Sequence, residues 1–133
     1  MIKLFIGSKG SGKTKTLIDL TNAAAEASKG SVVCMEKGDK LKHEITYKAR
    51  LIDTNSYAVD NAEYLYGFVA GVLASNSDIT DIFIDSALKI CNNDCAAFEG
   101  FLKRLEAISN GVNIVITASI AVEECPDAIK AYA

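Results

Sequence analysis

The sequence has little of several residue types on which whole classes of protein depend. It contains one histidine and one proline, and its four cysteines form no CxxC pair, so a four-ligand zinc site has too few suitably spaced ligands. Lysine and arginine number 14 against 17 acidic residues, and this formal charge of −3 disfavours nucleic acid as a partner. The apolar run at residues 1–6 is far too short for a signal peptide or a membrane span. We therefore expect a cytoplasmic protein with no membrane partner and with reduced, mostly buried cysteines.

Apolar residues, in contrast, are plentiful. They make up 50% of the 133 residues, against 23% charged residues, which excludes a disordered or collagen-like chain and suffices for one core. We expect a single domain over residues 1–133. Runs in which neighbouring residues are both apolar are typical of strands covered on both faces. Such runs occupy residues 2–6, 31–35, 82–84 and 112–116.

Helical periodicity separates these expected strands. In residues 13–28 the residues at helical spacing are Leu17, Leu20, Ala24 and Ala27. A second helix is predicted to begin at Asp60, which precedes Glu63 by three residues as in a capping box. A third runs from residues 92–94 to Ile108, and a short one follows Pro126. This alternation predicts an α/β fold: a three-layer α/β/α sandwich around a mainly parallel sheet.

Residues 38–59 do not fit the alternation. They mix lysines with apolar residues and predict a short strand or hairpin followed by a mobile connection. Tyr47, Tyr57 and Arg50 lie here and are candidates for stacking on a nucleotide base, with packing or solvent exposure as the alternative.

The strongest chemical signal follows the first expected strand and opens the first expected helix. The pattern GxxxxGK[ST], known as Walker A, is satisfied by Gly7, Ser8, Lys9, Gly10, Ser11, Gly12, Lys13 and Thr14. Backbone amides of such a loop surround phosphate oxygens, Lys13 reaches the β and γ phosphates, and Thr14 ligates Mg²⁺. The sequence therefore predicts a P-loop that binds a nucleotide with Mg²⁺ as cofactor.

A nucleoside triphosphate needs a second anchor for Mg²⁺ at the end of another strand. Asp85 directly follows the apolar run 82–84 and is the candidate, with a helix-cap or turn role as the alternative. The sequence has neither the NKxD nor the DxxG element of GTPases, so ATP is the expected nucleotide.

With these residues the chain resembles the P-loop NTPases, and among them the RecA-like ATPases. The resemblance implies that Glu36, at the end of the second strand, polarises the attacking water, and that Thr117 or Ser119 senses the γ phosphate. It also implies that the last strand lies between the Asp85 strand and the P-loop strand. A solvated Glu36 and a Thr117 hydroxyl bonded to backbone are the alternatives.

These residues favour a small Mg²⁺-dependent ATPase with slow turnover, in which Lys13 and Glu36 are the catalytic residues. Two alternatives stay open: a nucleoside-type small-molecule kinase, and a nucleotide-dependent switch without turnover. The sequence also leaves open a protein partner or a homo-oligomer.

Overall fold

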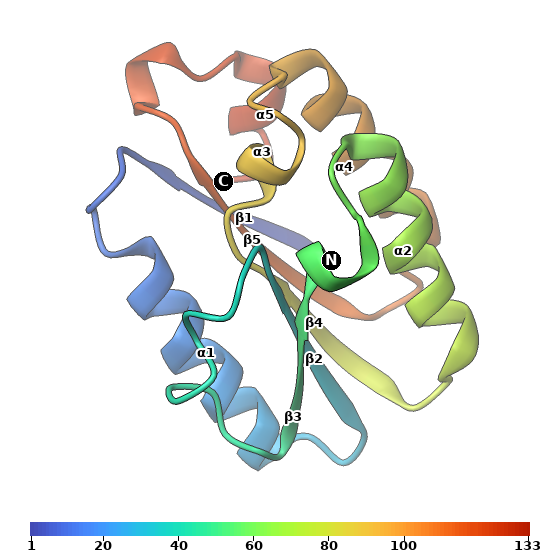
Figure 1. Ribbon diagram of the computed structural model, residues 1–133. Helices are drawn as coiled ribbons and strands as arrows, with labels where there is room; N and C mark the ends of the chain where they lie inside the picture. Colours follow the sequence, from blue (N-terminus) through green and yellow to red (C-terminus); the bar gives the residue numbers. More distant parts are fainter.

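The fold is built on one five-stranded sheet, seen in the computed structural model of residues 1–133 (Figure 1). The strands are β1 (Ile2–Gly7), β2 (Ser31–Glu36), β3 (Ala49–Asp53), β4 (Ile79–Ile84) and β5 (Asn113–Ser119). The helices are α1 (Lys13–Ala27), α2 (Ala62–Ser75), α3 (Ala87–Ile90), α4 (Cys95–Ile108) and α5 (Asp127–Lys130), with 3₁₀ turns η1 (Thr54–Tyr57) and η2 (Val122–Glu124). The expected α/β alternation is confirmed.

The strand order is β1-β5-β4-β2-β3, and every neighbouring pair is parallel. β5 therefore lies between β1 and β4, as the resemblance implied. Parallel strands bring their carboxyl ends to one edge of the sheet, so the residues that follow β1, β2, β4 and β5 meet there. This edge carries the polar residues singled out from the sequence.

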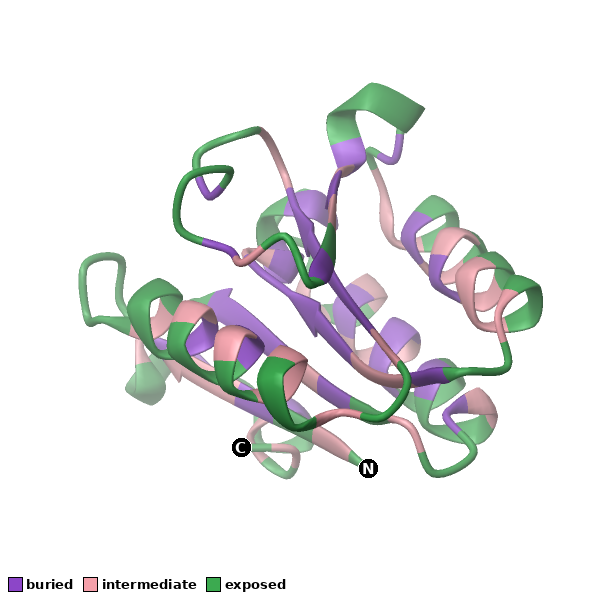
Figure 2. Cartoon of the chain, turned by 90° about the horizontal axis from the view of Figure 1, so that it is seen from below, coloured by how far each residue is buried: buried purple, intermediate pink, exposed green.

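Helices cover both faces of the sheet, which gives three layers. Figures 1 and 2 place α1 on one face and α2, α3 and α4 on the other. The larger core, on the α2 and α4 side, includes Leu65, Val69, Phe98 and Leu102, all fully buried. The smaller core joins Leu17 of α1 to the opposite face of the sheet. No helix is long and apolar enough to cross a membrane.

The four cysteines all carry free thiols, and three of them are buried, as expected from the sequence. Burial raises the pKa of both Cys34 and Cys91 to about 12. Their unreactive thiol form is therefore strongly favoured.

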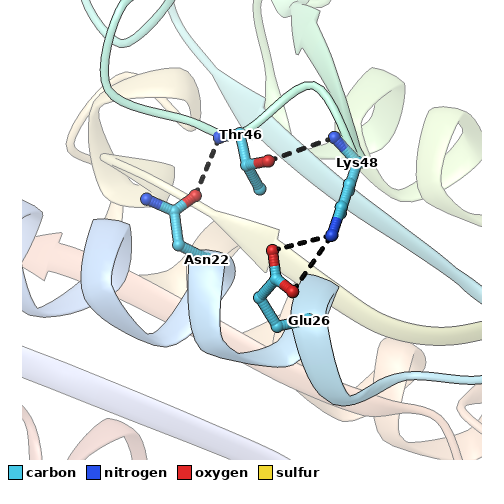
Figure 3. A network of polar contacts seen from close by, with 4 residues as sticks. All are labelled: Asn22, Glu26, Thr46 and Lys48. Carbon is cyan, nitrogen blue, oxygen red and sulfur yellow. Dashed lines mark hydrogen bonds and ion pairs between the residues drawn. The ribbon is translucent and has the colours of Figure 1, made fainter.

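Residues 38–59 form an edge strand and a well-anchored connection. β3 pairs with β2 in parallel, so the expected strand is present and the hairpin alternative is wrong. The connection before β3 buries Leu41 and Ile45 in the smaller core. Figure 3 shows a polar network between this connection and α1, in which the Asn22 amide oxygen accepts from Thr46 N–H at 2.8 Å and the Lys48 ammonium contacts the Glu26 carboxylate at 3.0 Å. These contacts tie the stretch to α1.

The structure adds a detail to the first expected helix and corrects the start of the second. In α1, Leu17 is fully buried, but Leu20 is 38% exposed and Ala27 is exposed, because no second helix covers the sheet beside α1. Leu20 instead lines an open apolar groove of about 450 Å³. In α2 the N-cap is Asn61, whose side chain accepts from Tyr64 N–H at 2.8 Å.

The capping box expected at Asp60 fails for an identifiable reason. Asn61, one residue later, has the extended backbone of an N-cap and an amide oxygen suited to accept a helix N–H. The Glu63 carboxylate does not reach back to the cap, since it pairs with the Arg104 guanidinium at 2.8 Å. In α4 the N-cap is Asp94, which agrees with the helix start expected at residues 92–94.

Candidate functional site

The glycine-rich loop, residues 7–14, joins β1 to α1 at the carboxyl edge of the sheet. Gly12 is the N-cap of α1 and has φ 89°, and Gly10 has φ 86°. Residues with a Cβ rarely adopt this left-handed conformation, which explains glycine at both positions. The loop thus turns directly into the amino terminus of a 15-residue helix, where free N–H groups and the helix dipole favour an anion.

The Lys13 side chain folds back over this loop. Its ammonium donates to the carbonyl oxygen of Ser8 at 3.0 Å and to the Ser11 hydroxyl at 3.3 Å. Burial lowers the pKa of Lys13, and the nearby Asp85 carboxylate opposes that change. The ammonium is therefore held at the loop by neutral oxygens only, and it can exchange these weak partners for an anion.

Asp85 is the centre of a buried polar cluster. It is 7% exposed and immediately follows β4. Its carboxylate accepts from the Thr14 hydroxyl at 3.2 Å and from the Thr117 hydroxyl at 2.7 Å. The N-cap of α3 is Ser86, so Asp85 does not cap that helix. The structure thus joins Thr14, the last residue of the glycine-rich loop, to the carboxylate after β4.

Thr117 lies behind Asp85 and is itself 2% exposed. Its hydroxyl accepts from the backbone N–H of Ser86 at 2.8 Å while it donates to Asp85. This hydroxyl is therefore fully engaged within the protein. Ser119, two residues later on β5, is exposed and reaches the wall of the cavity described below.

Glu36, the last residue of β2, is only 4% exposed. Its two carboxylate oxygens accept from the backbone N–H groups of Lys40 at 3.0 Å and Leu41 at 2.8 Å. Burial raises the pKa of Glu36, and these two hydrogen bonds oppose that change. The side chain is neither solvated nor free: it fixes the turn that follows β2.

These groups surround one cavity of about 650 Å³. Of the residues predicted from the sequence, the cavity wall contains Lys9, Gly10, Gly12, Lys13, Thr14, Glu36, Asp85 and Ser119. Gly7, Ser8 and Ser11 belong to the loop but not to the wall, and Thr117 is behind it. The wall includes none of the three candidates for base stacking, and Tyr47 is 91% exposed.

The cavity wall also contains residues that the sequence analysis missed. They are Lys15, Lys37, Lys40, Leu41, Ser86, Lys89 and Asn93. Proximity in sequence was an available signal for three of them, because Lys15 follows Thr14, Lys37 follows Glu36 and Ser86 follows Asp85. Lys89 and Asn93 reach the wall only through the α3 turn, which the sequence analysis did not predict.

The donor set suits Mg²⁺ bound together with phosphates. No group of three or more His, Cys, Asp or Glu residues is able to hold a metal ion unaided. The Thr14 hydroxyl and the Asp85 carboxylate are adjacent oxygen ligands, and Mg²⁺ is commonly held by one or two protein oxygens plus substrate phosphates. These two residues therefore fit the expected cofactor.

No protein-family model matches the chain, and a comparison with curated proteins found no match. Fold and site together define an α/β protein with a five-stranded parallel sheet and a polar, lysine-rich cavity at its carboxyl edge.

Proposed function

We propose that the protein is a P-loop NTPase of the RecA-like type that binds Mg-ATP and hydrolyses it slowly in the cytoplasm. The observation that carries this proposal is the contact between Thr14 and Asp85, which joins the residue after Lys13 to the carboxylate after β4. A glycine-rich turn used only for packing needs no such partner. The position of β5 between β1 and β4 supports the same proposal.

Each residue would have a distinct task in binding. Amides of the loop and of the first turn of α1 would surround the phosphates, and Lys13 would leave the Ser8 and Ser11 oxygens for the β and γ phosphates. Thr14 and Asp85 would hold Mg²⁺, which supplies charge neutralisation between phosphate oxygens. Thr117 would keep the Asp85 carboxylate oriented toward Thr14.

Two features account for slow turnover: the backbone N–H groups that occupy the Glu36 carboxylate, and the absence of an arginine from the cavity wall. Both carboxylate oxygens of Glu36 already accept a backbone N–H group, so fewer of their lone pairs are free to orient the attacking water. The chain has two arginines: Arg104 pairs with Glu63, and Arg50 lies on β3 away from the cavity wall. An arginine at the transferring phosphate accelerates such reactions by about 10³ or more, and neither arginine of this chain lies on the cavity wall.

Calorimetry with Mg-ATP, combined with measurement of phosphate release on the same sample, tests the proposal. Lys13→Ala should abolish binding, whereas the matched Lys29→Ala, an exposed lysine outside the cavity, should leave it unchanged. Glu36→Gln should keep binding and lose turnover. Absence of Mg-ATP binding by the unaltered protein would refute the proposal, and binding without release would refute only its hydrolytic part.

A further inference from the structure

The cavity concentrates positive charge in an acidic protein. Its wall contains six of the chain's twelve lysines and only two carboxylates, those of Glu36 and Asp85. The whole chain, in contrast, has a formal charge of −3. Clefts lined by one sign of charge concentrate ligands of the other sign, so this cavity favours anions.

Three of these lysines lie apart from the glycine-rich loop, and we call them the lysine wall: Lys37, Lys40 and Lys89. Lys37 and Lys40 follow β2, and Lys89 is on α3, which follows β4. Two strands separate β1 from β2 in the sheet, so their carboxyl ends are about 14 Å apart at normal strand spacing. Lys37 and Lys40 therefore lie on a different part of the cavity from the loop, and Lys89, after β4, lies between these two lysines and the loop.

None of the lysine-wall ammonium groups is neutralised within the protein. The chain has five ion pairs, and only Lys15 of the six cavity lysines takes part in one, with Asp19. Lys37 donates to the amide oxygen of Asn55 at 3.0 Å, a neutral partner. The two wall carboxylates are already occupied by hydroxyl and backbone donors.

The turn that carries Lys37 and Lys40 is held rigidly. The buried Glu36 carboxylate accepts from the Lys40 and Leu41 N–H groups, and the Asp53 carboxylate accepts from Gly38 N–H at 2.9 Å. Burying a carboxylate costs desolvation free energy, and an ordinary surface turn forms without such a buried group. The geometry thus places Glu36 as a positioning residue for the lysine wall.

The negative charge of one bound nucleotide is smaller than the positive charge that the cavity supplies. Mg²⁺ cancels about two of the four negative charges of a nucleoside triphosphate, and the remainder is close to what the loop lysines Lys9 and Lys13 supply. Glu36 and Asp85 keep their negative charges, since their donors are neutral, and Lys15 is paired with Asp19, so the cavity with a bound Mg-nucleotide retains a net charge of about +1. A cavity of about 650 Å³ is within the usual range of roughly 300–1,000 Å³ for small-molecule sites.

We propose that Lys37, Lys40 and Lys89 form a second anion subsite, which holds the phosphate group of a small molecule beside the nucleotide. This subsite is called the second because the proposed function places the nucleotide in the first, so that part of the proposal rests on the proposed function. Lysine binds phosphate as a point charge, and the Asn93 amide on the same wall can add a directional donor. The acidic remainder of the surface repels a long polyanion, so the ligand class is a small phosphate-bearing molecule.

Calorimetric titration of inorganic phosphate tests the subsite in two arms. In the first arm the protein is saturated with Mg²⁺ and a non-hydrolysable ATP analogue, so the triphosphate positions are filled. We expect one phosphate to bind, with affinity at least about tenfold weaker in the double variant Lys40→Ala/Lys89→Ala. The matched double variant Lys29→Ala/Lys130→Ala removes the same charge outside the cavity and should bind as the unaltered protein does.

The second arm needs no nucleotide. Lys13→Ala disables the loop, and phosphate should still bind to this variant with the same dependence on Lys40 and Lys89. If the analogue fails to bind but this arm succeeds, the proposed function is wrong and the anion subsite stands. If phosphate binds in neither arm, or if Lys40→Ala/Lys89→Ala weakens the analogue instead, the subsite proposal is overturned.

The same assay distinguishes the two sources of a phosphate group. Glycerol phosphate serves as a simple phosphate ester, and a fixed pH keeps its charge comparable with that of inorganic phosphate. Tighter binding of the ester would assign the subsite to a phosphorylated small molecule. Tighter binding of inorganic phosphate would assign it to free phosphate.

Discussion

At the scale of single residues, the site depends on the hydroxyl groups that donate hydrogen bonds to the Asp85 carboxylate and hold it in one orientation. Its carboxylate is nearly buried, and the two nearest hydroxyls that donate to it come from α1 and β5, with the Ser86 hydroxyl as a longer third donor at 3.5 Å. Thr117 also accepts the backbone N–H of Ser86, whose φ of 57° belongs to the sparsely populated left-handed region. One hydroxyl thus orients the carboxylate and supports the strained residue beside it.

Replacement of Thr117 by valine should therefore be costly although the shape is nearly unchanged. Thr117→Val leaves the Ser86 N–H and one Asp85 oxygen without their buried partner, and we expect the free energy of unfolding to fall by about 1–3 kcal/mol. Thr117→Ser keeps the hydroxyl and serves as the control. Urea unfolding measures both variants; equal stability of the valine and serine variants would contradict the role assigned to the hydroxyl.

Lys13 should make phosphate binding sensitive to alkaline pH. Burial lowers the pKa of Lys13 in the free protein, whereas a bound phosphate favours the charged ammonium and raises it. As the pH rises through the lowered pKa of free Lys13, binding therefore takes up a proton and affinity falls, and this fall begins below the pH at which an ordinary lysine titrates. Calorimetry in two buffers of different ionisation enthalpy measures the uptake.

Lys13→Arg is the matched variant for this effect, since arginine stays charged throughout that range. If it retains binding, it should bind without proton uptake. Uptake of the same size in Lys13→Arg would assign the titration to another group.

At the scale of elements, the sequence shows which residues of a helix share a face, but not which neighbouring element packs against that face. The apolar stripe of α4 packs between the sheet and α2, and Phe98, Leu102 and Leu105 are buried. Periodicity in α1 marks the same kind of stripe, but no second helix covers the sheet beside α1, so Leu20 remains partly exposed at the open groove. Periodicity reveals which residues share a face, and the partner decides how much of that face is covered.

The parallel pairing of β3 with β2 could not be predicted from the sequence, for a related reason. A parallel crossover normally contains a helix, and the connection from β2 to β3 contains none. It is stabilised by contacts with α1, through Leu41, Ile45 and the Asn22 side chain. Such long-range contacts leave no local periodicity.

The difference in burial between Leu17 and Leu20 of α1 predicts that substitution by alanine has unequal effects at the two positions. Leu17→Ala should lower the free energy of unfolding by about 2–5 kcal/mol, because it opens a cavity in the smaller core. Leu20→Ala should cost about 1 kcal/mol, because that side chain already borders an open groove. Equilibrium unfolding by urea, followed by circular dichroism, compares the two. Equal losses would mean that the groove is covered in solution.

At the scale of the whole molecule, the sequence located the glycine-rich loop, Glu36 and Asp85, since each is a local pattern at the end of a strand. It did not reveal the lysine wall, because its three lysines come from two separate segments that only the sheet brings together. It also suggested base-stacking residues, Tyr47, Tyr57 and Arg50, that the fold directs elsewhere. Tyr57, for example, packs on Phe68 of α2, with ring centroids 5.6 Å apart.

The cavity should consequently discriminate little between nucleotide bases. Its wall has one hydrophobic residue, Leu41, and no aromatic ring, so the stacking energy of about 1–3 kcal/mol per base is missing. Charge dominates the wall, and the triphosphate is common to all nucleotides. We expect ATP, GTP, CTP and UTP to compete with a fluorescent ATP analogue with affinities within about tenfold of each other, a spread of roughly 1.4 kcal/mol. Inorganic triphosphate is the control without a base and should compete nearly as well; a preference for one base of a hundredfold or more would require a base contact that this wall does not contain.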